Sequence, residues 1–389
     1  MSNSSVFKPR LPSPTHGFRE IVRNKFFREL RISLKAHGIF LFIAIGFFLA
    51  AHLVILPLAG HESAVAADIL DIFKMLLLMV VPIVFLSVLI NRFLFLAIYV
   101  RPQSPTKALY NELKVYFSNR CRLLNAIPMT LAMVLFITAY VGVKAAIPAL
   151  NPFSWDLTFD AWDRVLHFGA RPWELLQPVL GYNFVTFLVS VSYNLWFMVM
   201  WMVWCLLAFS EQPTRLRLQF FLSFMVVWLV GGSVLAVAFS SAGPVYFEEL
   251  GLHPDPYAPL MNHLYEVNET FPIWALATQE LLWDGYLGNQ TTVVGISAMP
   301  SMHNATAVLL ALAGWKISRP LGIGLTAFAI LILLGSVHLG WHYAIDGYFA
   351  IVLALACWWI SGFIAKWWEN TNWYRSHVQQ IEDLGSAQS

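Results

Sequence analysis

The sequence predicts an all-α, polytopic integral membrane protein, a helix bundle with about eight transmembrane helices. Its 389 residues are 58% hydrophobic and only 12% charged, whereas soluble domains carry about 25% charged residues. Eight apolar stretches approach the roughly 20 residues that a membrane-spanning helix needs. They cover residues 39–59, 72–91, 127–147, 183–208, 218–241, 302–315, 320–338 and 345–365, and the short sixth stretch is expected to begin near Ser297.

Lysine and arginine gather in alternate connections between these stretches. They are dense in residues 1–38, between the second and third stretches, and after the fourth, sixth and eighth. The connection from Ala242 to Met299 has neither residue, although it carries seven acidic residues. Because positively charged loops stay in the cytoplasm, both termini are expected there. The 242–299 connection is then outside, in a bacterial periplasm or a eukaryotic lumen.

Composition divides the chain into four segments. The first, 1–38, is basic and has apolar residues four apart, at Phe18, Val22, Phe26, Leu30 and Leu34. This spacing predicts an amphipathic helix on the anionic cytoplasmic leaflet, with a disordered basic tail as the alternative. Residues 39–150 are expected to be peripheral spans, 151–366 the catalytic core with its outer loops, and 367–389 a cytoplasmic tail. Within the core, the tryptophan-rich 152–182 stretch is expected as an interfacial or re-entrant element.

Two short polar stretches lie at the edges of apolar segments. Residues 300–302 lead into His303, and His342 is followed four residues later by Asp346. Titratable groups in such places are costly, so they indicate a functional site. If the last span begins near Trp341, His342 and Asp346 share one helix face, where the carboxylate orients the imidazole as a nucleophile. The topology puts His303 at the same membrane face, where it is placed to protonate a leaving group.

The stretches 298–303 and 339–346 resemble the second and third signature motifs of the type 2 phosphatidic acid phosphatase superfamily. The resemblance implies a core of six membrane helices and a phosphohistidine intermediate, with no cofactor and no metal. By matching position, it implies that His342 attacks phosphorus, that Asp346 orients it and that His303 is the general acid. Ser301 matches the serine that helps to hold the phosphate.

The chain departs from the phosphatases of that superfamily in its cations. No lysine or arginine lies between Ser241 and Met299, where their first motif is expected, and Gly335 and Ser336 replace a Ser-Arg pair of the third motif. A phosphate monoester carries nearly two negative charges at neutral pH, because its second pKa is about 6, and it needs strong cationic partners. A site with few cations is better matched to a phosphodiester, which carries one charge.

The chain therefore resembles the branch that transfers phospho-headgroups between lipids, the inositol phosphorylceramide synthases and their bacterial relatives. Residues 242–246 lie where that branch has its own first motif, and residues 163–169 and 176–178 resemble its outer loop. This resemblance implies a phosphodiester donor such as phosphatidylinositol and a hydroxyl acceptor, either a lipid such as ceramide or a polyol. The expected partners are these molecules and the bilayer, and no nucleic acid.

Four further residues are candidate substrate contacts, each with a structural alternative. His338 either contacts phosphate in place of the missing arginine or is an interfacial histidine. Tyr246 either orients substrate through its hydroxyl or anchors the interface. Arg164 and Arg171 either supply the missing positive charge or pair with neighbouring carboxylates. Lys144, near the outer end of the third stretch, is expected to extend its head to the membrane interface.

Three alternatives to phosphotransfer with this site remain open. With water as acceptor, the same residues make a lipid phosphate or pyrophosphate phosphatase, which would draw its cation from Arg164 or Arg171. From another functional class, the protein is a transporter or scaffold whose histidines bind protons or metal. A metal site formed by His338, His342 and Asp346 is the third, but Gly340 interrupts the helical spacing that it requires.

Overall fold

The computed structural model describes residues 14–60, 65–288 and 295–386, and all regular structure within these ranges is helical. The expected polytopic helical membrane bundle is confirmed. Seven of the described helical segments are long and apolar enough to cross a membrane: Gly38–Leu58, Val81–Val100, Arg120–Leu150, Asn183–Ala208, Arg215–Ala238, Arg319–His338 and Ala344–Trp368.

The sixth expected span is a shorter helix, α15 (Met302–Ile317), with 16 residues. It nevertheless stands inside the bundle, packed against α11, α16 and α17. The expectation that this helix begins near Ser297 is wrong. Residues 295–301 are not helical, and the Ser301 side chain accepts a hydrogen bond from the backbone of Asn304 as the N-cap of α15.

Polar caps set several helix starts. Ser104, Asn119, Thr214, Ser301 and Ser318 each accept a backbone N–H of the following turn. Such caps satisfy donors that the first turn of a helix leaves without a partner. In a bilayer this matters more, because no water is present to replace them.

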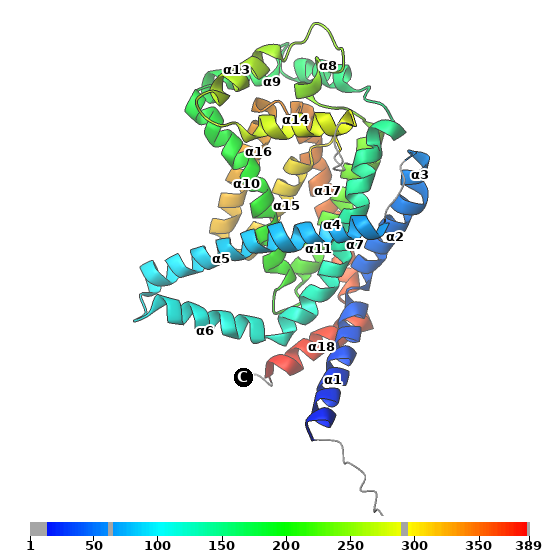
Figure 1. Ribbon diagram of the computed structural model, residues 1–389, viewed down its shortest axis with the longest axis vertical. Coiled ribbons are helices and arrows are strands. Elements are labelled where there is room, and N and C mark those ends of the chain that lie inside the picture. The colour runs from blue at the N-terminus through cyan, green and yellow to red at the C-terminus, as the bar shows by residue number, and fades with distance from the viewer. Residues whose placement is uncertain (1–13, 61–64, 289–294, 387–389) are drawn as a thin grey trace, which may run out of the picture.

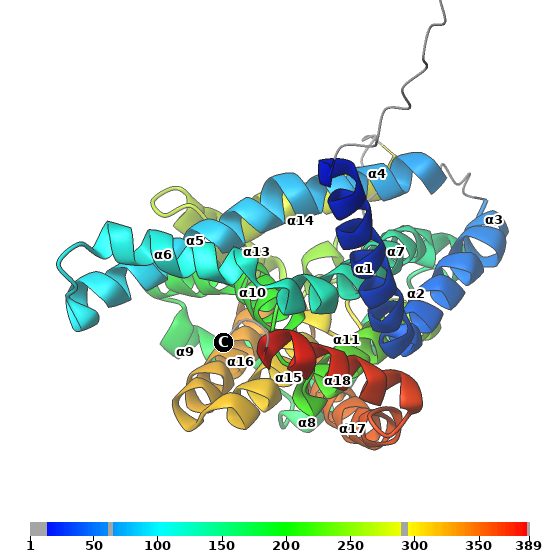
Figure 2. The same cartoon turned by 90° about the horizontal axis from the view of Figure 1, so that it is seen from below.

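The centre of the bundle consists of five helices that stand side by side (Figures 1 and 2). Close packing of α15 on α16 depends on small residues, since a Cβ added at Gly322 would lie 2.5 Å from the Trp315 ring. Membrane helices use small residues in this way to bring their backbones together. The five are α10 (Asn183–Ala208), α11 (Arg215–Leu229, continued by the π-helical turn Val230–Leu235 and α12, Ala236–Ala238), α15, α16 (Arg319–His338) and α17 (Ala344–Trp368).

One end of the bundle is covered by a cap of short helices (Figure 1); we call it the capped end. Its elements are α8 (Asp156–Leu166), α9 (Pro172–Leu180), the 3₁₀ turn Pro244–Tyr246, α13 (Ala258–Asn268) and α14 (Trp274–Tyr286). The tryptophan-rich 152–182 stretch thus forms α8 and α9 of this cap.

The opposite end, which we call the open end, carries α1 (Pro14–Ala36), α6 (Pro105–Ser118) and α18 (Asn372–Ser386). The expected amphipathic helix is α1, and Phe26 and Leu30 on it pack against Cys121 and Ile381 of α7 and α18. Part of its apolar face therefore contacts protein. Residues 1–13 and 387–389, which complete the expected first and last segments, lie outside the described ranges, as do the side chains of Phe18 and Val22.

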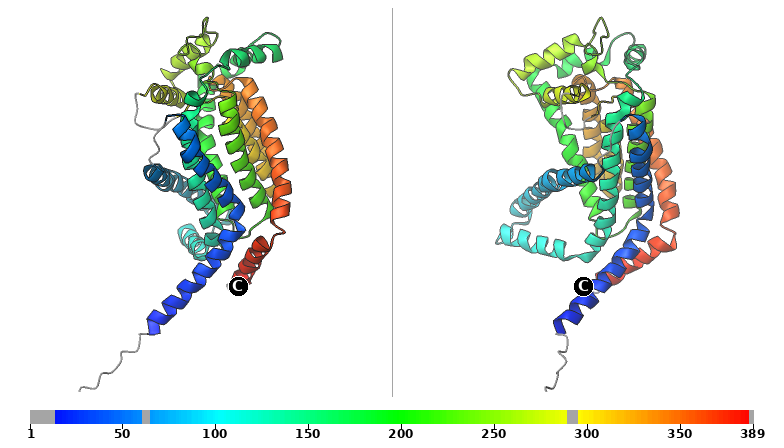
Figure 3. Two further views of the ribbon diagram at one scale, coloured as in Figure 1. Left: turned by 90° about the vertical axis from the view of Figure 1, so that its right-hand side faces the viewer. Right: turned by 45° about the vertical axis from the view of Figure 1, so that its right-hand side comes forward.

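The second expected span lies within a long helical run that crosses the bundle. This run comprises α4 (Val65–Met75), Leu76–Val80, α5 (Val81–Phe95) and Leu96–Val100, with π-helical turns between the α-helical parts. It lies crosswise in Figure 1 and is seen nearly end-on in the left view of Figure 3.

Helix α7 (Arg120–Leu150) runs along the bundle from the open end to the capped end. It packs against α2 (Gly38–Ala50), which continues through Ala51–Ile55 into α3 (Leu56–Leu58). The 39–150 segment was expected to be peripheral, but α7 is largely buried and contributes side chains to the cavity described below.

Candidate active site

A cavity of about 670 Å³ lies near the capped end of the bundle. Helices α7, α10, α11 and α14 surround it, together with the loops that precede α15 and α17. Aromatic and histidine rings make up about half of its lining residues, and polar side chains such as Lys144, Asn194 and Thr278 also contribute. The lining residues come from segments far apart in the sequence. The rings that line it are Tyr140, Tyr193, Trp196, Phe197, Trp228, Tyr246, His303, Trp341 and His342.

His303 and His342, the two histidines predicted from the motifs, both line this cavity. Their ring centroids lie 6.4 Å apart, with the ring planes inclined by 58°. Reacting atoms approach to about 3–3.5 Å before a bond forms, so this separation leaves room for one phosphorus atom between the rings. His303, in the first turn of α15, is held by ring contacts with Tyr193 and Trp196 of α10, at centroid distances of 4.7 and 4.0 Å.

His342 does not share a helix face with Asp346, contrary to the sequence-based expectation. Helix α17 begins at Ala344, so His342 lies in the preceding loop and Asp346 in the first turn. His342 Nδ1 lies 3.4 Å from Asp346 Oδ2, and the Tyr343 backbone N–H donates to the same oxygen at 3.0 Å. The fully buried carboxylate therefore caps α17 while it faces the imidazole. The histidine contact is long for a hydrogen bond, as is common for catalytic pairs without substrate.

The protonation state of His342 follows from its surroundings. Burial, and after it the Lys144 ammonium, lower the pKa of His342 to about 3. The usual histidine pKa is about 6.5, so the imidazole is neutral at physiological pH. A neutral imidazole has a free electron pair, which is the form that attacks an electrophile.

Two glycines shape the loop that carries His342. Gly340 has a φ of +73° and Gly243 a φ of +106°, a backbone conformation that favours glycine. A Cβ at Gly243 would lie 2.7 Å from the Trp341 carbonyl oxygen. The Val245 backbone N–H also donates to the Gly340 oxygen at 2.9 Å. The 242–246 stretch, which lies where the lipid-transferring branch has its own first motif, thus packs against the backbone of the loop that carries His342.

Asp156 of α8 binds this support directly. Its carboxylate accepts hydrogen bonds from the Ala242 and Gly243 backbone N–H groups at 3.1 and 2.9 Å. It also accepts the Tyr343 hydroxyl at 3.0 Å. The buried Asp156 side chain therefore connects the 242–246 stretch with the loop that carries His342.

Asp163, about two turns further along α8 than Asp156, binds the start of α17. It accepts the Ala344 and Ile345 backbone N–H groups at 2.7 and 2.9 Å. Burial raises the pKa of Asp163 to about 7, although the two backbone donors act in the opposite direction. Helix α8 therefore positions the His342–Asp346 segment through two carboxylates that the motif analysis did not single out.

Two other predicted residues lie close to the histidines. Ser301 is fully buried, and its hydroxyl accepts a hydrogen bond from Asn304 Nδ2 at 3.0 Å, so it organises the start of α15. Tyr246 lines the cavity with its ring. Its hydroxyl points elsewhere, donating to the Gln279 carbonyl at 2.9 Å.

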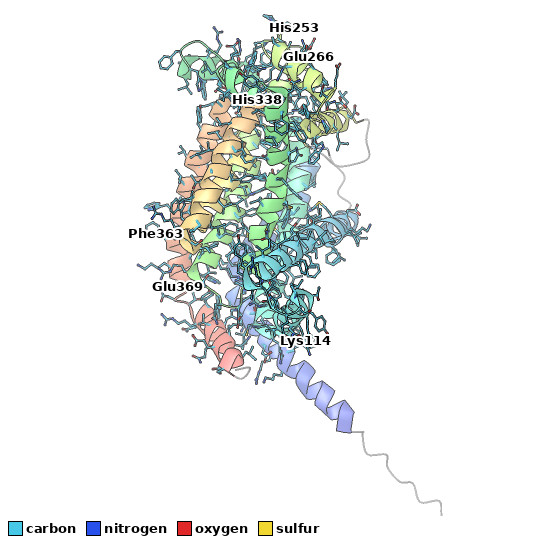
Figure 4. The ribbon with its side chains drawn as sticks, turned by 90° about the vertical axis from the view of Figure 1, so that its left-hand side faces the viewer. Lys114, His253, Glu266, His338, Phe363 and Glu369 are labelled. Atoms are coloured by element: carbon cyan, nitrogen blue, oxygen red, sulfur yellow. The ribbon has the colours of Figure 1, made fainter. Side chains whose placement is uncertain are left out.

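The remaining three candidates do not line the cavity. His338 is buried beneath the cap (Figure 4), with Nε2 3.0 Å from the Thr186 hydroxyl of α10. Arg171 forms an ion pair with Asp160 at 2.7 Å. Arg164 extends from the surface of α8, with the Gly169 carbonyl 3.5 Å from Nε. Their positions give no support to a contact with phosphate. Across the described ranges, no three His, Cys, Asp or Glu side chains are arranged to hold a metal ion.

Lys144 of α7 lines the cavity together with both histidines. The sequence predicted that its head extends to the membrane interface and did not assign it to the site. A lysine inside an apolar helix does indicate a functional site, but this residue lies far along the chain from both motifs, so the sequence alone does not connect it with them.

Comparison with known proteins places this geometry in a family. Among curated proteins and among solved structures, none matches the chain. A family model described as the PAP2 superfamily matches residues 157–360, more than half of the chain. The matched stretch runs from α8 of the cap to α17 and contains His303, His342 and Asp346. The chain therefore belongs to the PAP2 superfamily, as its two motifs predicted.

Proposed function

We propose that the protein is a membrane phosphotransferase that moves a phospho-headgroup from a phosphodiester lipid, such as phosphatidylinositol, to a hydroxyl acceptor. Membership of the PAP2 superfamily supports phosphatase or phosphotransferase activity on lipids in general. The narrower proposal rests on one observation: two imidazoles 6.4 Å apart share a cavity in which the described lining residues include one lysine and no arginine. That charge matches one negative charge on the substrate better than two.

The first step forms a phosphohistidine. The far nitrogen of His342 attacks phosphorus, and the bond from phosphorus to the lipid alcohol oxygen breaks. His303, which carries a proton when the anionic diester is bound beside it, transfers that proton to the departing oxygen. Asp346 stabilises the positive charge that develops on the His342 ring. The phospho-headgroup then remains on His342, and the lipid alcohol leaves.

The second step reverses these roles. His303, now neutral, removes a proton from the acceptor hydroxyl, and the oxygen attacks phosphorus. The phosphorus–nitrogen bond breaks and regenerates neutral His342. The acceptor is a lipid such as ceramide or a polyol; water in its place makes the reaction a hydrolysis. The aromatic wall suits a lipid substrate, since it excludes water from the transfer.

The test uses the purified protein in detergent–lipid micelles, with a diester donor labelled at phosphorus and an added acceptor. We expect label on the acceptor and an acid-labile phosphohistidine in the wild type. Both should be lost in His342→Ala. His253→Ala, an exposed histidine of the cap (Figure 4), is the matched control and should keep wild-type activity.

Two results would contradict the proposal. One is transfer that persists in His342→Ala. The other is rapid release of inorganic phosphate from phosphatidic acid or a polyprenyl pyrophosphate, with no transfer from a diester, which would make the protein a phosphatase.

A further inference from the structure

We propose that Lys144 of α7 is the residue that binds the transferred phosphate, and that its single charge selects a singly charged phosphodiester. The inference rests on the proposed function, since it assigns a role within that same site. It identifies a cation outside the stretch that the family comparison matches, because Lys144 precedes residue 157.

The position of Lys144 supports this role. It is the one lysine or arginine among the described residues that line the cavity, where His303 and His342 also lie. Its charge acts on both rings, because it lowers the pKa of His342 and is also close enough to influence His303. The ammonium therefore shares one cavity with the two imidazoles that would flank phosphorus.

The backbone fixes Lys144 relative to the histidines. A Cβ at Gly295 would lie 2.5 Å from the Lys144 carbonyl carbon and oxygen, so the two backbones touch. Gly295 begins the described part of the loop that leads to His303. The loop that carries one histidine is therefore packed directly on the helix turn that carries the lysine.

The surroundings of Lys144 leave its charge uncompensated. Throughout the described ranges no hydrogen bond or ion pair is formed by its ammonium, and no carboxylate lines the cavity. The two arginines of the cap are placed differently, because Arg171 forms an ion pair with Asp160 and Arg164 is exposed on α8. Lys144 is only partly exposed, so its charge loses part of its hydration without gaining a protein partner, which is costly, and an anionic ligand is the natural compensation. A phosphodiester supplies one negative charge, which one ammonium balances.

The experiment separates charge recognition from packing. It compares two unreactive lipid analogues of the same shape, a phosphonate monoester with one negative charge and its neutral methyl ester. Each is measured as a competitive inhibitor of wild type, Lys144→Met and Lys144→Arg, alongside kcat/KM for the diester donor. Lys316→Met, an exposed lysine at the far end of α15, is the matched control.

We expect Lys144→Met to weaken binding of the charged analogue about 10- to 100-fold, the range for a charge-assisted hydrogen bond. Binding of the neutral analogue should change less than about twofold, since it lacks that interaction. Lys144→Arg should restore part of the loss, and Lys316→Met should match the wild type. The acid limb of the kcat/KM profile should also move to higher pH in Lys144→Met, because the ammonium no longer depresses the pKa of His342.

Each other outcome decides the question. If the wild type transfers phosphate and Lys144→Met binds the charged analogue normally, the role of Lys144 is refuted and the proposed function stands. Equal losses for both analogues would show a packing role and also refute it. If the wild type neither transfers nor forms phosphohistidine, the proposed function itself fails. Should Lys144→Met not fold, Lys144→Gln tests the same contrast with a polar side chain.

Discussion

The ionisation of a single ring, His342, makes the first prediction at the scale of residues. Its pKa of about 3 lies well below the roughly 6.5 of an unfolded histidine. The ring therefore stays neutral and nucleophilic from about pH 5 to about pH 8. We expect kcat/KM for a diester donor, which does not itself titrate in this range, to show no acid limb near pH 6.5. A one-proton loss of kcat/KM as the pH falls through about 6.5 would contradict the burial of this ring.

The same pKa has a consequence for stability. A histidine with a lowered folded-state pKa contributes nothing above pH 6.5 and destabilises the fold as the pH falls below it, because the unfolded chain binds the proton first. The cavity end of the bundle should therefore be less stable at pH 5 than at pH 7.

Gly243 gives a second residue-scale prediction, with Gly251 as its control. Both have positive φ, at +106° and +72°, but only at Gly243 would a Cβ meet another group, the Trp341 oxygen at 2.7 Å. Gly243→Ala should displace the loop of His342 and lower kcat at least about tenfold, since small misplacements of reacting groups cost about that much or more. Gly251→Ala should cost only about 1 kcal/mol of backbone strain and leave kcat unchanged. Steady-state kinetics and thermal unfolding of both variants measure the difference.

Single residues also show where sequence reasoning stops. His303, His342 and Asp346 were locatable because their motifs are short and contiguous. Lys144 was not, since its role depends on α7 passing beside a loop about 150 residues later in the chain. The expected shared helix face of His342 and Asp346 failed because Tyr343 and Asp346 cap α17 and start it at Ala344. Spacing alone does not reveal on which side of a cap a residue lies.

At the scale of elements, α8 holds the first turn of α17 through hydrogen bonds to the Asp163 carboxylate. Asp163→Asn keeps the size of the side chain but replaces one of the two acceptor oxygens that hold the Ala344 and Ile345 N–H groups. The start of α17, which carries Asp346 beside His342, should loosen. We expect kcat to fall about tenfold while KM changes little, because Asp163 positions the nucleophile without lining the cavity. Glu280→Gln on the exposed face of α14 is the control. Equal kcat for both variants would show that α8 is not needed for positioning.

Hydropathy located most elements but not their directions. Seven described helices that are long and apolar enough to span a membrane each overlap a stretch expected from apolar length. The 72–91 stretch is apolar enough to be a span, yet it lies within a run that crosses the bundle (Figure 3). Length and composition set whether a helix tolerates lipid, whereas its tilt depends on packing against neighbours. For the same reason α7 could not be recognised as part of the site, because its apolar sequence does not show which helices it contacts.

For the whole molecule, the fold separates two kinds of charge. The capped end carries the acidic residues of the 248–284 segment, whereas the open end carries the basic α1 and the connection that contains α6. The cavity lies near the capped end. From the excess of lysine and arginine, we expect the open end in the cytoplasm and the capped end outside. The reaction that we propose would then use the outer leaflet, and the phospho-headgroup would never enter the cytoplasm.

This orientation is tested by two exposed positions at opposite ends of the molecule, Glu266 on α13 and Lys114 on α6 (Figure 4). Each is replaced singly, as Glu266→Cys or Lys114→Cys, in a Cys205→Ala background, since Cys121 and Cys357 are buried and Cys205 is only partly so. Intact cells are treated with a membrane-impermeant maleimide. The Glu266→Cys protein should react at once, because nothing separates α13 from the external solution. The Lys114→Cys protein should react only after the membrane is opened. Labelling of the Lys114→Cys variant alone would place the basic end outside and put the histidine pair on the cytoplasmic side, where a different pool of lipids and acceptors would be its substrates. Labelling of both variants in intact cells would show that α6 is reached from outside, which also contradicts the expected orientation.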